Sequence, residues 1–191
     1  MRGLPQGYTA RPATVDDEGV IVNMVNESSR RVRGRIALTP EQIRAQLVMP
    51  GIELAEDTRL VFDPQGELAA LATCLHFAPH VHVQSDGLVA EDHQGRGIGT
   101  ALLGWIEGRA QRALELAPPD ARVALMQSSD GRNASARQFL EEHGFAACRH
   151  FVRMLIEMTA PPPQPEWPSG ITVRAIDPEA ELEAAFRVSR E

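Results

Sequence analysis

Three glycines at alternate positions, Gly95, Gly97 and Gly99, form the pattern in this sequence that is best suited to bind a ligand. Glycine has no Cβ, so the backbone amides of such a loop can approach a ligand closely. The run Gly87–Ala90 before the loop is typical of the end of a buried strand, and apolar residues from Ile98 onward recur at the spacing of an amphipathic helix. Free amides and the positive end of the helix dipole both point at a loop in this position. The sequence therefore predicts a phosphate site, and we expect a pyrophosphate.

Two common nucleotide motifs do not fit this loop. A P-loop needs a lysine after its glycines, and the chain contains no lysine, because all 19 basic residues are arginine. The dinucleotide fingerprint Gly-x-Gly-x-x-Gly/Ala needs glycine or alanine at its sixth position. This chain has Thr100 there when counting from Gly95, and Leu102 when counting from Gly97. Both motifs are excluded.

The segment Gln94–Gly99 instead resembles the Gln/Arg-x-x-Gly-x-Gly/Ala signature of the GNAT superfamily of N-acetyltransferases. In that superfamily the loop holds the pyrophosphate of the cosubstrate acetyl-coenzyme A. The strand before the loop, Leu88–Glu91, also matches the superfamily pattern Leu-Val-x-Pro/Glu. The resemblance covers residues 8–158 and implies acetyl-coenzyme A as cosubstrate, without a metal ion.

Later parts of the chain resemble the same superfamily. A short strand over Arg122–Met126 is followed by a helix that opens at Asn133 and closes at the pair Gly144–Phe145. In physical terms, Asn133 suits a helix N-cap and the glycine suits a left-handed stop. The loop and this later helix together identify the chain as similar to GNAT proteins.

The resemblance implies an α/β GNAT fold, in which a mixed central β-sheet of about six to seven strands is flanked by helices on both faces. Apolar periodicity and turn signals place the elements. We predict strands over Tyr8–Arg11, Leu60–Phe62, Leu68–Phe77, His80–Val89 and Arg122–Met126, and one long strand over Phe145–Met158. We predict helices over Asp16–Arg30, from Thr39 as N-cap with Pro40 in first position, after the glycine loop, and after Asn133.

The amino-acid composition changes at a proline-rich segment near residue 160. We assign residues 1–159 to the GNAT domain, 160–170 to a Pro-rich linker, and 171–191 to the start of a second, truncated GNAT-like unit or to a tail that covers the sheet. Ile171–Ile176 resembles Tyr8–Ala13, which favours the first alternative and the N-terminal half of a tandem GNAT protein. We expect Ile171–Ile176 to form a strand that covers an exposed sheet edge.

The resemblance also implies the cosubstrate contacts. In the superfamily the loop amides bind the pyrophosphate, the preceding strand pairs with the pantetheine arm, and an asparagine contacts the cosubstrate from the far side. The positions of this chain that match are Leu88, Val89, Ala90, Gln94, Gly95, Arg96, Gly97, Ile98, Gly99, Thr100 and Asn133.

Acetyl transfer requires a base for the attacking amine, a donor for the oxyanion and an acid for the leaving thiolate. Many GNAT members carry the acid as a tyrosine four residues before the glycine of Gly-Phe, whereas this chain has Leu140 there and a single tyrosine, Tyr8. The base candidates are Asp86 and Glu91, and then His82 and His80, on or beside the strand before the loop. Each of these also suits a solvated surface.

Five arginines near the first two helices bear on the acceptor: Arg30, Arg31, Arg33, Arg35 and Arg44. Their planar forks suit a carboxylate or a phosphate, so an acceptor amine that also bears an acidic group would fit. The alternative is a solvated charged face. The function that the sequence favours is acetyl-coenzyme A-dependent transfer to a primary amine of a small molecule or peptide. The other hypothesis, consistent with Leu140, is a non-catalytic, coenzyme A-binding or structural half of a tandem acetyltransferase.

Composition agrees with a cytoplasmic enzyme domain. The net charge of −7 and the isoelectric point near 5.4 argue against a nucleic-acid surface, which would be basic. No apolar run has the length of a signal peptide or of a membrane span, so we expect no membrane association. Cys74 and Cys148 lie far apart in apolar runs and are expected to be reduced thiols. We expect a monomer or a homodimer.

Overall fold

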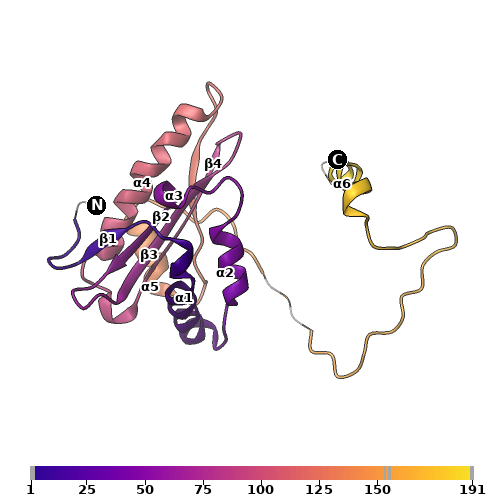
Figure 1. The fold of residues 1–191 in the computed structure, drawn as a ribbon, viewed down its shortest axis with the longest axis horizontal. Coiled ribbons are helices and arrows are strands. Elements are labelled where there is room, and N and C mark those ends of the chain that lie inside the picture. Colours follow the sequence, from indigo (N-terminus) through magenta and orange to yellow (C-terminus); the bar gives the residue numbers. More distant parts are fainter. Residues whose placement is uncertain (1–2, 153, 155, 190–191) are drawn as a thin grey trace. The chain divides into compact units, whose positions relative to one another are not determined.

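The computed structural model describes residues 3–152, 154 and 156–189. The chain divides into two units, Met1–Ala146 and Ala147–Glu191, and most of their helices and strands are labelled in Figure 1. The second unit contains helix α6 (Pro178–Val188), which begins where the Asp177 carboxylate accepts hydrogen bonds from backbone amides of the first turn. All other helices and strands of the described residues belong to the first unit.

The first unit is built on a five-stranded sheet with the order β1-β2-β3-β4-β5. Its strands are β1 (Thr9–Arg11), β2 (Thr58–Phe62), β3 (Leu68–His76), β4 (His82–Val89) and β5 (Ala124–Gln127). The first four strands pair antiparallel with their neighbours, and β5 pairs parallel with β4. This is the mixed α/β sheet that the sequence predicts, with fewer strands.

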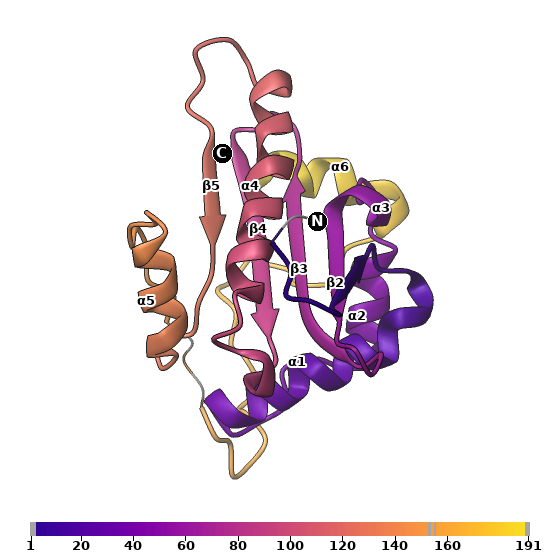
Figure 2. The same ribbon diagram turned by 90° about the vertical axis from the view of Figure 1, so that its left-hand side faces the viewer.

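Helices lie on both faces of this sheet. They are η1 (Val15–Asp17), α1 (Glu18–Arg33), α2 (Pro40–Leu47), α3 (Leu54–Asp57), η2 (Glu91–His93), α4 (Ile98–Leu116) and α5 (Ala134–Glu142). Figure 2 shows α4 crossing one face, while α1 and α2 lie on the other. Within the described ranges, no helix combines the length and the apolar character that crossing a membrane requires.

Local signals fix the ends of several helices as predicted. Thr39 and Gln42 form a reciprocal capping box at the start of α2, with Pro40 in first position. The Asn133 side chain accepts the Ala136 amide at 3.0 Å and begins α5. Gly144 follows α5 with φ of 83°, the left-handed conformation that ends a helix.

Successive side chains of each strand point to opposite faces of the sheet, and apolar side chains form a core on each face. On one face, Ala72, Cys74 and Val83 pack under the buried side of α4, which includes Ile98 and Ile106. Small side chains on β3 leave room for a long helix to lie close to the sheet. The core on the opposite face is formed by Ala13, Ile21, Val22, Ile43 and Leu60. Helix α4 is thus held on one face of β4, and α1 on the other.

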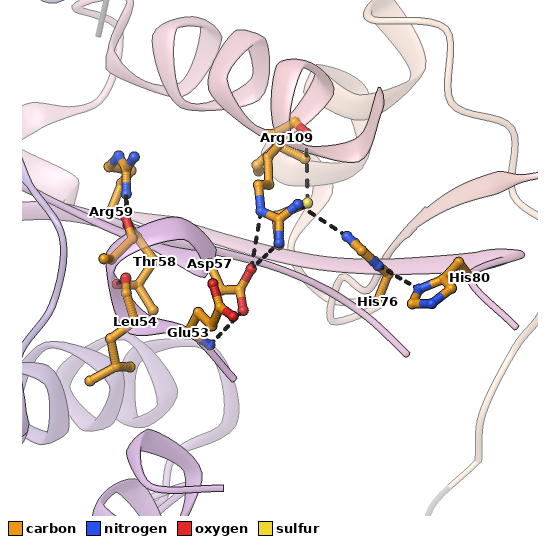
Figure 3. A network of polar contacts seen from close by, with 11 residues as sticks. Glu53, Leu54, Asp57, Thr58, Arg59, His76, His80 and Arg109 are labelled. Atoms are coloured by element: carbon orange, nitrogen blue, oxygen red, sulfur yellow. Dashed lines mark hydrogen bonds and ion pairs between the residues drawn. The ribbon is translucent and has the colours of Figure 1, made fainter. Parts of the chain in front are cut away.

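A buried polar network fixes the second half of α4 to the sheet. Figure 3 shows Arg109 between Asp57 and His76, with His80 beyond. Arg109 donates to Asp57 at 2.7 Å and to His76 Nε2 at 3.0 Å, and His76 Nδ1 lies 2.8 Å from His80 Nδ1. The Arg109 and Asp57 side chains are only 14% and 6% exposed, so this ion pair is shielded from water.

Two strand predictions at the C-terminal side are wrong. Among the described residues of Phe145–Met158 and in all of Ile171–Ile176, the chain forms no strand; positions 153 and 155 lie outside the described residues. Phe151 and Val152 are 84% and 85% exposed. An alternating pattern shows which side chains a strand would bury, but a strand also needs a partner for its amides and carbonyls. The sheet therefore has five strands rather than six to seven.

Each predicted strand that forms differs from its predicted range by one or two residues at one or both ends, and the start of β4 has a clear local cause. β4 begins at His82 rather than at His80, because His80 has a left-handed φ of 62° and its amide donates to the Phe77 carbonyl at 2.7 Å. This places His80 in the turn between β3 and β4. The turn over residues 63–66, between β2 and β3, forms as predicted, with the Gly66 amide bonded to the Asp63 carbonyl.

Candidate functional site

The glycine loop connects the end of β4 to the start of α4. Gly95 and Gly97 have φ of 71° and 81°, and a Cβ at either position would meet no atom within 4 Å. The need for glycine is therefore conformational rather than steric. Gly97 is the N-cap of α4 and provides no side-chain hydrogen bond, whereas Thr39 and Asn133 cap their helices with side chains. The first-turn amides of α4 thus remain available to an anion.

Beside the loop, β4 and β5 stop pairing. The last paired residues are Ser85 and Gln127, after which β4 continues to Val89 and β5 has ended. β3 pairs with β4 as far as Val89 on the other side. In the part of the chain that the structure describes, no strand pairs with residues 86–89 on the β5 side. The backbone groups that point to that side can therefore pair with an extended, amide-bearing ligand.

A polar side chain that the sequence analysis missed lies at this opening. Gln127 Oε1 is buried and accepts no hydrogen bond within the described residues. A Cβ on Gly87 would come within 3.3 Å of Gln127 Nε2, so the glycine makes room for this amide. Leu125 packs in the core under α4, and Gln127, two residues on, shares that face of the sheet. The signal in the sequence was a polar residue that ends an otherwise apolar strand.

The other predicted ligand-binding side chains lie around the same opening. Gln94 Nε2 donates to the Val89 carbonyl at 3.3 Å, and Arg96 and Thr100 are exposed. Asn133 Oδ1 is used by the cap of α5, which leaves the side-chain NH2 of Asn133 as its available donor. The ring of Phe139, on α5, lies 3.5 Å from the Cβ position of Gly99. The loop, α4 and α5 therefore meet at one edge of the β4–β5 opening.

Asp86 lies on the opposite face of β4. Val83 is buried under α4, so Asp86, three residues on, belongs to the face that α1 and α2 cover. It is the cross-strand neighbour of Thr73, and its side chain reaches solvent. The surrounding protein nevertheless desolvates the carboxylate and raises the pKa of Asp86 above its usual value. A carboxylate of raised pKa beside the opening is suited to accept a proton.

The remaining base candidates are placed less favourably. Glu91 forms an ion pair with Arg31, so its carboxylate is already engaged. His80 contacts His76 in the turn, and His82 is the first residue of β4. Both histidines lie toward the opposite end of β4 from the loop, about 23 Å away for seven residues of strand.

The last turn of α1 is tied to both sides of the opening. Arg31 pairs with Glu91, which follows β4, and Arg33 Nε lies 2.7 Å from Asp130, which follows β5. These pairs hold the end of α1 across the opening on the Asp86 face. Of the five arginines noted in the sequence, Arg44 also has a partner, Glu18 at 2.6 Å, whereas no ion pair of Arg30 or Arg35 is present among the described residues.

At the position where many GNAT members carry a tyrosine, this chain has Leu140, whose side chain has no proton to donate. Leu140 is half-buried on α5. The single tyrosine, Tyr8, contacts His93 and Arg96 beside the glycine loop. In the described part of the chain, no three His, Cys, Asp or Glu side chains gather as a metal site requires.

A second opening runs along α4 on its α3 side. It is a groove of about 850 Å³, lined on α4 by Gly97, Thr100, Gly104 and Gly108 among others, and on the sheet side by Arg59. The Arg59 guanidinium is stacked 4.8 Å from the Trp105 ring. Arg112 also lines this groove and is exposed.

Comparison with known proteins identifies the class that this loop and sheet define. Residues 54–147 match the Acetyltransferase (GNAT) domain family. A GCN5-related N-acetyltransferase from Sphaerobacter thermophilus superimposes with a TM-score of 0.80 at 28% identity, over 98% of this chain and 59% of that one. The chain belongs to the GNAT family of acetyltransferases.

More particular similarity is to a mycothiol acetyltransferase of Frankia casuarinae, which is 31% identical over 108 residues. That match spans 56% of this chain and 29% of the relative, so the chain covers less than a third of the relative's length. A protein of Salmonella typhimurium, solved with its cofactor acetyl-CoA, shares the fold with a TM-score of 0.55 at 18% identity. It aligns over 75% of this chain and 82% of that one.

Proposed function

We propose that the chain is an acetyl-coenzyme A-dependent N-acetyltransferase that acts on a primary amine of a small molecule or peptide. The observation that carries the proposal is the opening between β4 and β5, with an uncapped helix N-terminus at its end and the unpaired Gln127 oxygen beside it. An anionic group belongs at the helix N-terminus, and an amide-bearing arm belongs along the unpaired edge of β4.

In this proposal each part of the cosubstrate contacts a different set of residues. The amides of Gly95–Gly99, with Gln94, Arg96 and Thr100, bind the pyrophosphate. The unpaired backbone edge of Leu88–Ala90 pairs with the pantetheine arm, and Gln127 Oε1 accepts an N–H of that arm. The Asn133 amide approaches from the α5 side. The fit is chemical as well as geometric, because the opening offers donors at its anionic end and both donors and acceptors along the arm.

The acceptor amine approaches from the Asp86 face. Its nitrogen attacks the thioester carbonyl carbon, the C–N bond forms as the C–S bond breaks, and Asp86 accepts the proton that the nitrogen loses. An unpaired backbone N–H of β4 is positioned to stabilise the oxyanion. The leaving thiolate takes its proton from water, because Leu140 offers none. Arg30 and Arg35, which have no ion pair among the described residues, support an acceptor that also bears an acidic group.

Calorimetric titration with coenzyme A tests the binding half of this proposal. Gly97→Val should abolish binding, because valine is strained at a φ of 81°. Gly34→Val is the matched control, since Gly34 has a φ of 73° and equally open surroundings at the end of α1. If Gly97→Val binds as the wild type does, the loop is not the cosubstrate site.

Turnover tests the catalytic half. Release of coenzyme A is measured with a panel of amines, amino acids and peptides, with and without an acidic group. The chain has no lysine, so acetyl transfer to its own side-chain amines adds no background. Binding without turnover across the panel would favour the second candidate, a coenzyme A-binding half of a longer acetyltransferase. Leu140 in place of the usual tyrosine favours that candidate.

A further inference from the structure

Four polar side chains from separate parts of the chain are linked beside the glycine loop. Arg96 Nη1 donates to the Tyr8 hydroxyl at 3.2 Å, and this hydroxyl lies 2.7 Å from His93 Nδ1. His93 Nε2 lies 3.7 Å from the Asp63 carboxylate, within electrostatic contact. The links join the loop to Tyr8, next to β1, and to Asp63, in the turn after β2.

The Asp63 carboxylate favours one direction for these links. It faces His93 Nε2 and so favours the tautomer that carries its hydrogen on Nε2. In that tautomer His93 Nδ1 accepts from the Tyr8 hydroxyl, and the Tyr8 oxygen accepts from Arg96, which only donates. Each group therefore fixes the orientation of the next, and the series ends at the Arg96 guanidinium.

The charge on Arg96 is held by a neutral partner. Arg31, Arg33 and Arg109 pair with carboxylates, whereas the side-chain partner of Arg96 is a phenol. The nearest carboxylate of the series, that of Asp63, also accepts two backbone amides of its own turn. In a protein with a net charge of −7, an exposed cation held by a neutral hydroxyl retains its charge for an anionic ligand.

We propose that Tyr8 and His93 are positioning residues that hold the Arg96 guanidinium ready to bind the pyrophosphate of acetyl-coenzyme A. This inference rests on the proposed function, because it assigns a second layer of residues to the same loop. Holding a long side chain in place before the ligand arrives removes the entropic cost of ordering it on binding. The expected contribution is about three- to tenfold in affinity.

The first experiment compares two acetyl donors in the wild type and in Tyr8→Phe, which removes only the hydroxyl. S-acetylpantetheine lacks the pyrophosphate that Arg96 would bind. Tyr8→Phe should raise KM for acetyl-coenzyme A about three- to tenfold with little change in kcat, and should leave kcat/KM for S-acetylpantetheine unchanged. Calorimetry with coenzyme A should show the same loss in Kd.

The second experiment is a double-mutant cycle on coenzyme A binding. If Tyr8 acts through Arg96, then Arg96→Ala and the double variant with Tyr8→Phe should bind coenzyme A equally weakly. Arg112→Ala controls for the loss of one exposed positive charge on the α4 side. His93→Gln keeps an acceptor and a donor and should retain most of the affinity, whereas His93→Leu should match Tyr8→Phe.

Equal losses with both acetyl donors, or additive losses in the double variant, would show that Tyr8 acts on the fold and would overturn the inference. Wild-type affinity in Tyr8→Phe would overturn it as well. If the wild type itself fails to bind coenzyme A, the proposed function fails, and this inference fails with it. Wild-type binding followed by unchanged affinity in Tyr8→Phe separates the two cases.

Discussion

Replacing Gln127 by methionine should make the protein more stable and a weaker binder of coenzyme A. The Gln127 side-chain oxygen is buried without a donor among the described residues, so the unliganded fold carries the cost of its desolvation. A buried, unsatisfied polar group costs about 1–3 kcal/mol. Methionine has a similar length and no polar oxygen, so it fills the same space beside Gly87 without this cost.

The expected gain is about 1–2 kcal/mol in the free energy of unfolding, which corresponds to a rise of about 2–8 °C in Tm for a protein of this size. The expected loss is one hydrogen bond to the pantetheine arm, about 0.5–1.5 kcal/mol or a two- to twelvefold increase in Kd. Thermal unfolding of the unliganded protein gives the first quantity, and calorimetric titration with coenzyme A gives the second.

Gln111→Met is the matched control, because Gln111 is exposed on α4 rather than buried beside the opening. Gln111→Met should change neither the free energy of unfolding nor the Kd for coenzyme A. The reasoning is refuted if Gln127→Met lowers Tm, because the Gln127 oxygen would then have a stabilising partner in the unliganded protein. It is equally refuted if the variant gains stability but binds coenzyme A as the wild type does.

Three further predictions address other groups. Leu140→Tyr should raise kcat more than it changes the KM for acetyl-coenzyme A, because a phenol at that position would protonate the thiolate only in the transition state. An unchanged kcat in a well-folded variant would show that the proton comes from another source. Burial, and then the charges of Arg109 and His80, lower the pKa of His76, so the folded protein favours the neutral imidazole. The neutral imidazole therefore contributes to the stability of the fold above the unfolded pKa of about 6.5, and this contribution is lost as the pH falls. His76→Gln, which can still accept from Arg109, should therefore flatten the pH dependence of Tm between about pH 7 and 5, and an unaltered dependence would contradict this. The hydrogen bonds from Arg11 lower the pKa of Asp17 to about 2. The ionised Asp17 carboxylate therefore contributes to stability above about pH 4, and this contribution is lost toward pH 2. Arg11→Met should reduce the acid-induced fall in Tm over that interval, and a fall as steep as in the wild type would argue against the stabilising pair.

The features that the sequence predicts correctly depend on local chemistry. Thr39 and Asn133 cap helices through bonds to amides three residues away, so their roles are visible in a short window. The left-handed glycines of the loop are likewise a local requirement. The strand at Phe145–Met158 fails because a strand depends on a partner that no local pattern reveals, and its alternation is present whether or not that partner exists.

The polar details of the site depend on contacts between distant positions. Tyr8 and His93 are 85 residues apart, and nothing in either local sequence indicates that they meet. Gln127 is an ordinary strand residue until the register places it opposite Ser85, where the two strands stop pairing. For Glu91, the ion pair with Arg31 is equally invisible in the sequence, although it decides how available that carboxylate is.

The opposite orientations of Asp86 and Gln127 about the sheet have a kinetic consequence. In the proposed function, the acetyl donor binds on the α4 and α5 side of β4 and the amine reaches the opening from the α1 side, so neither ligand would block the entrance of the other. Both can therefore be bound at once, and the acetyl group can pass directly between them through the sheet. Initial-rate lines measured at several fixed amine concentrations should intersect rather than run parallel, and no acetylated form of the protein should accumulate when the amine is withheld.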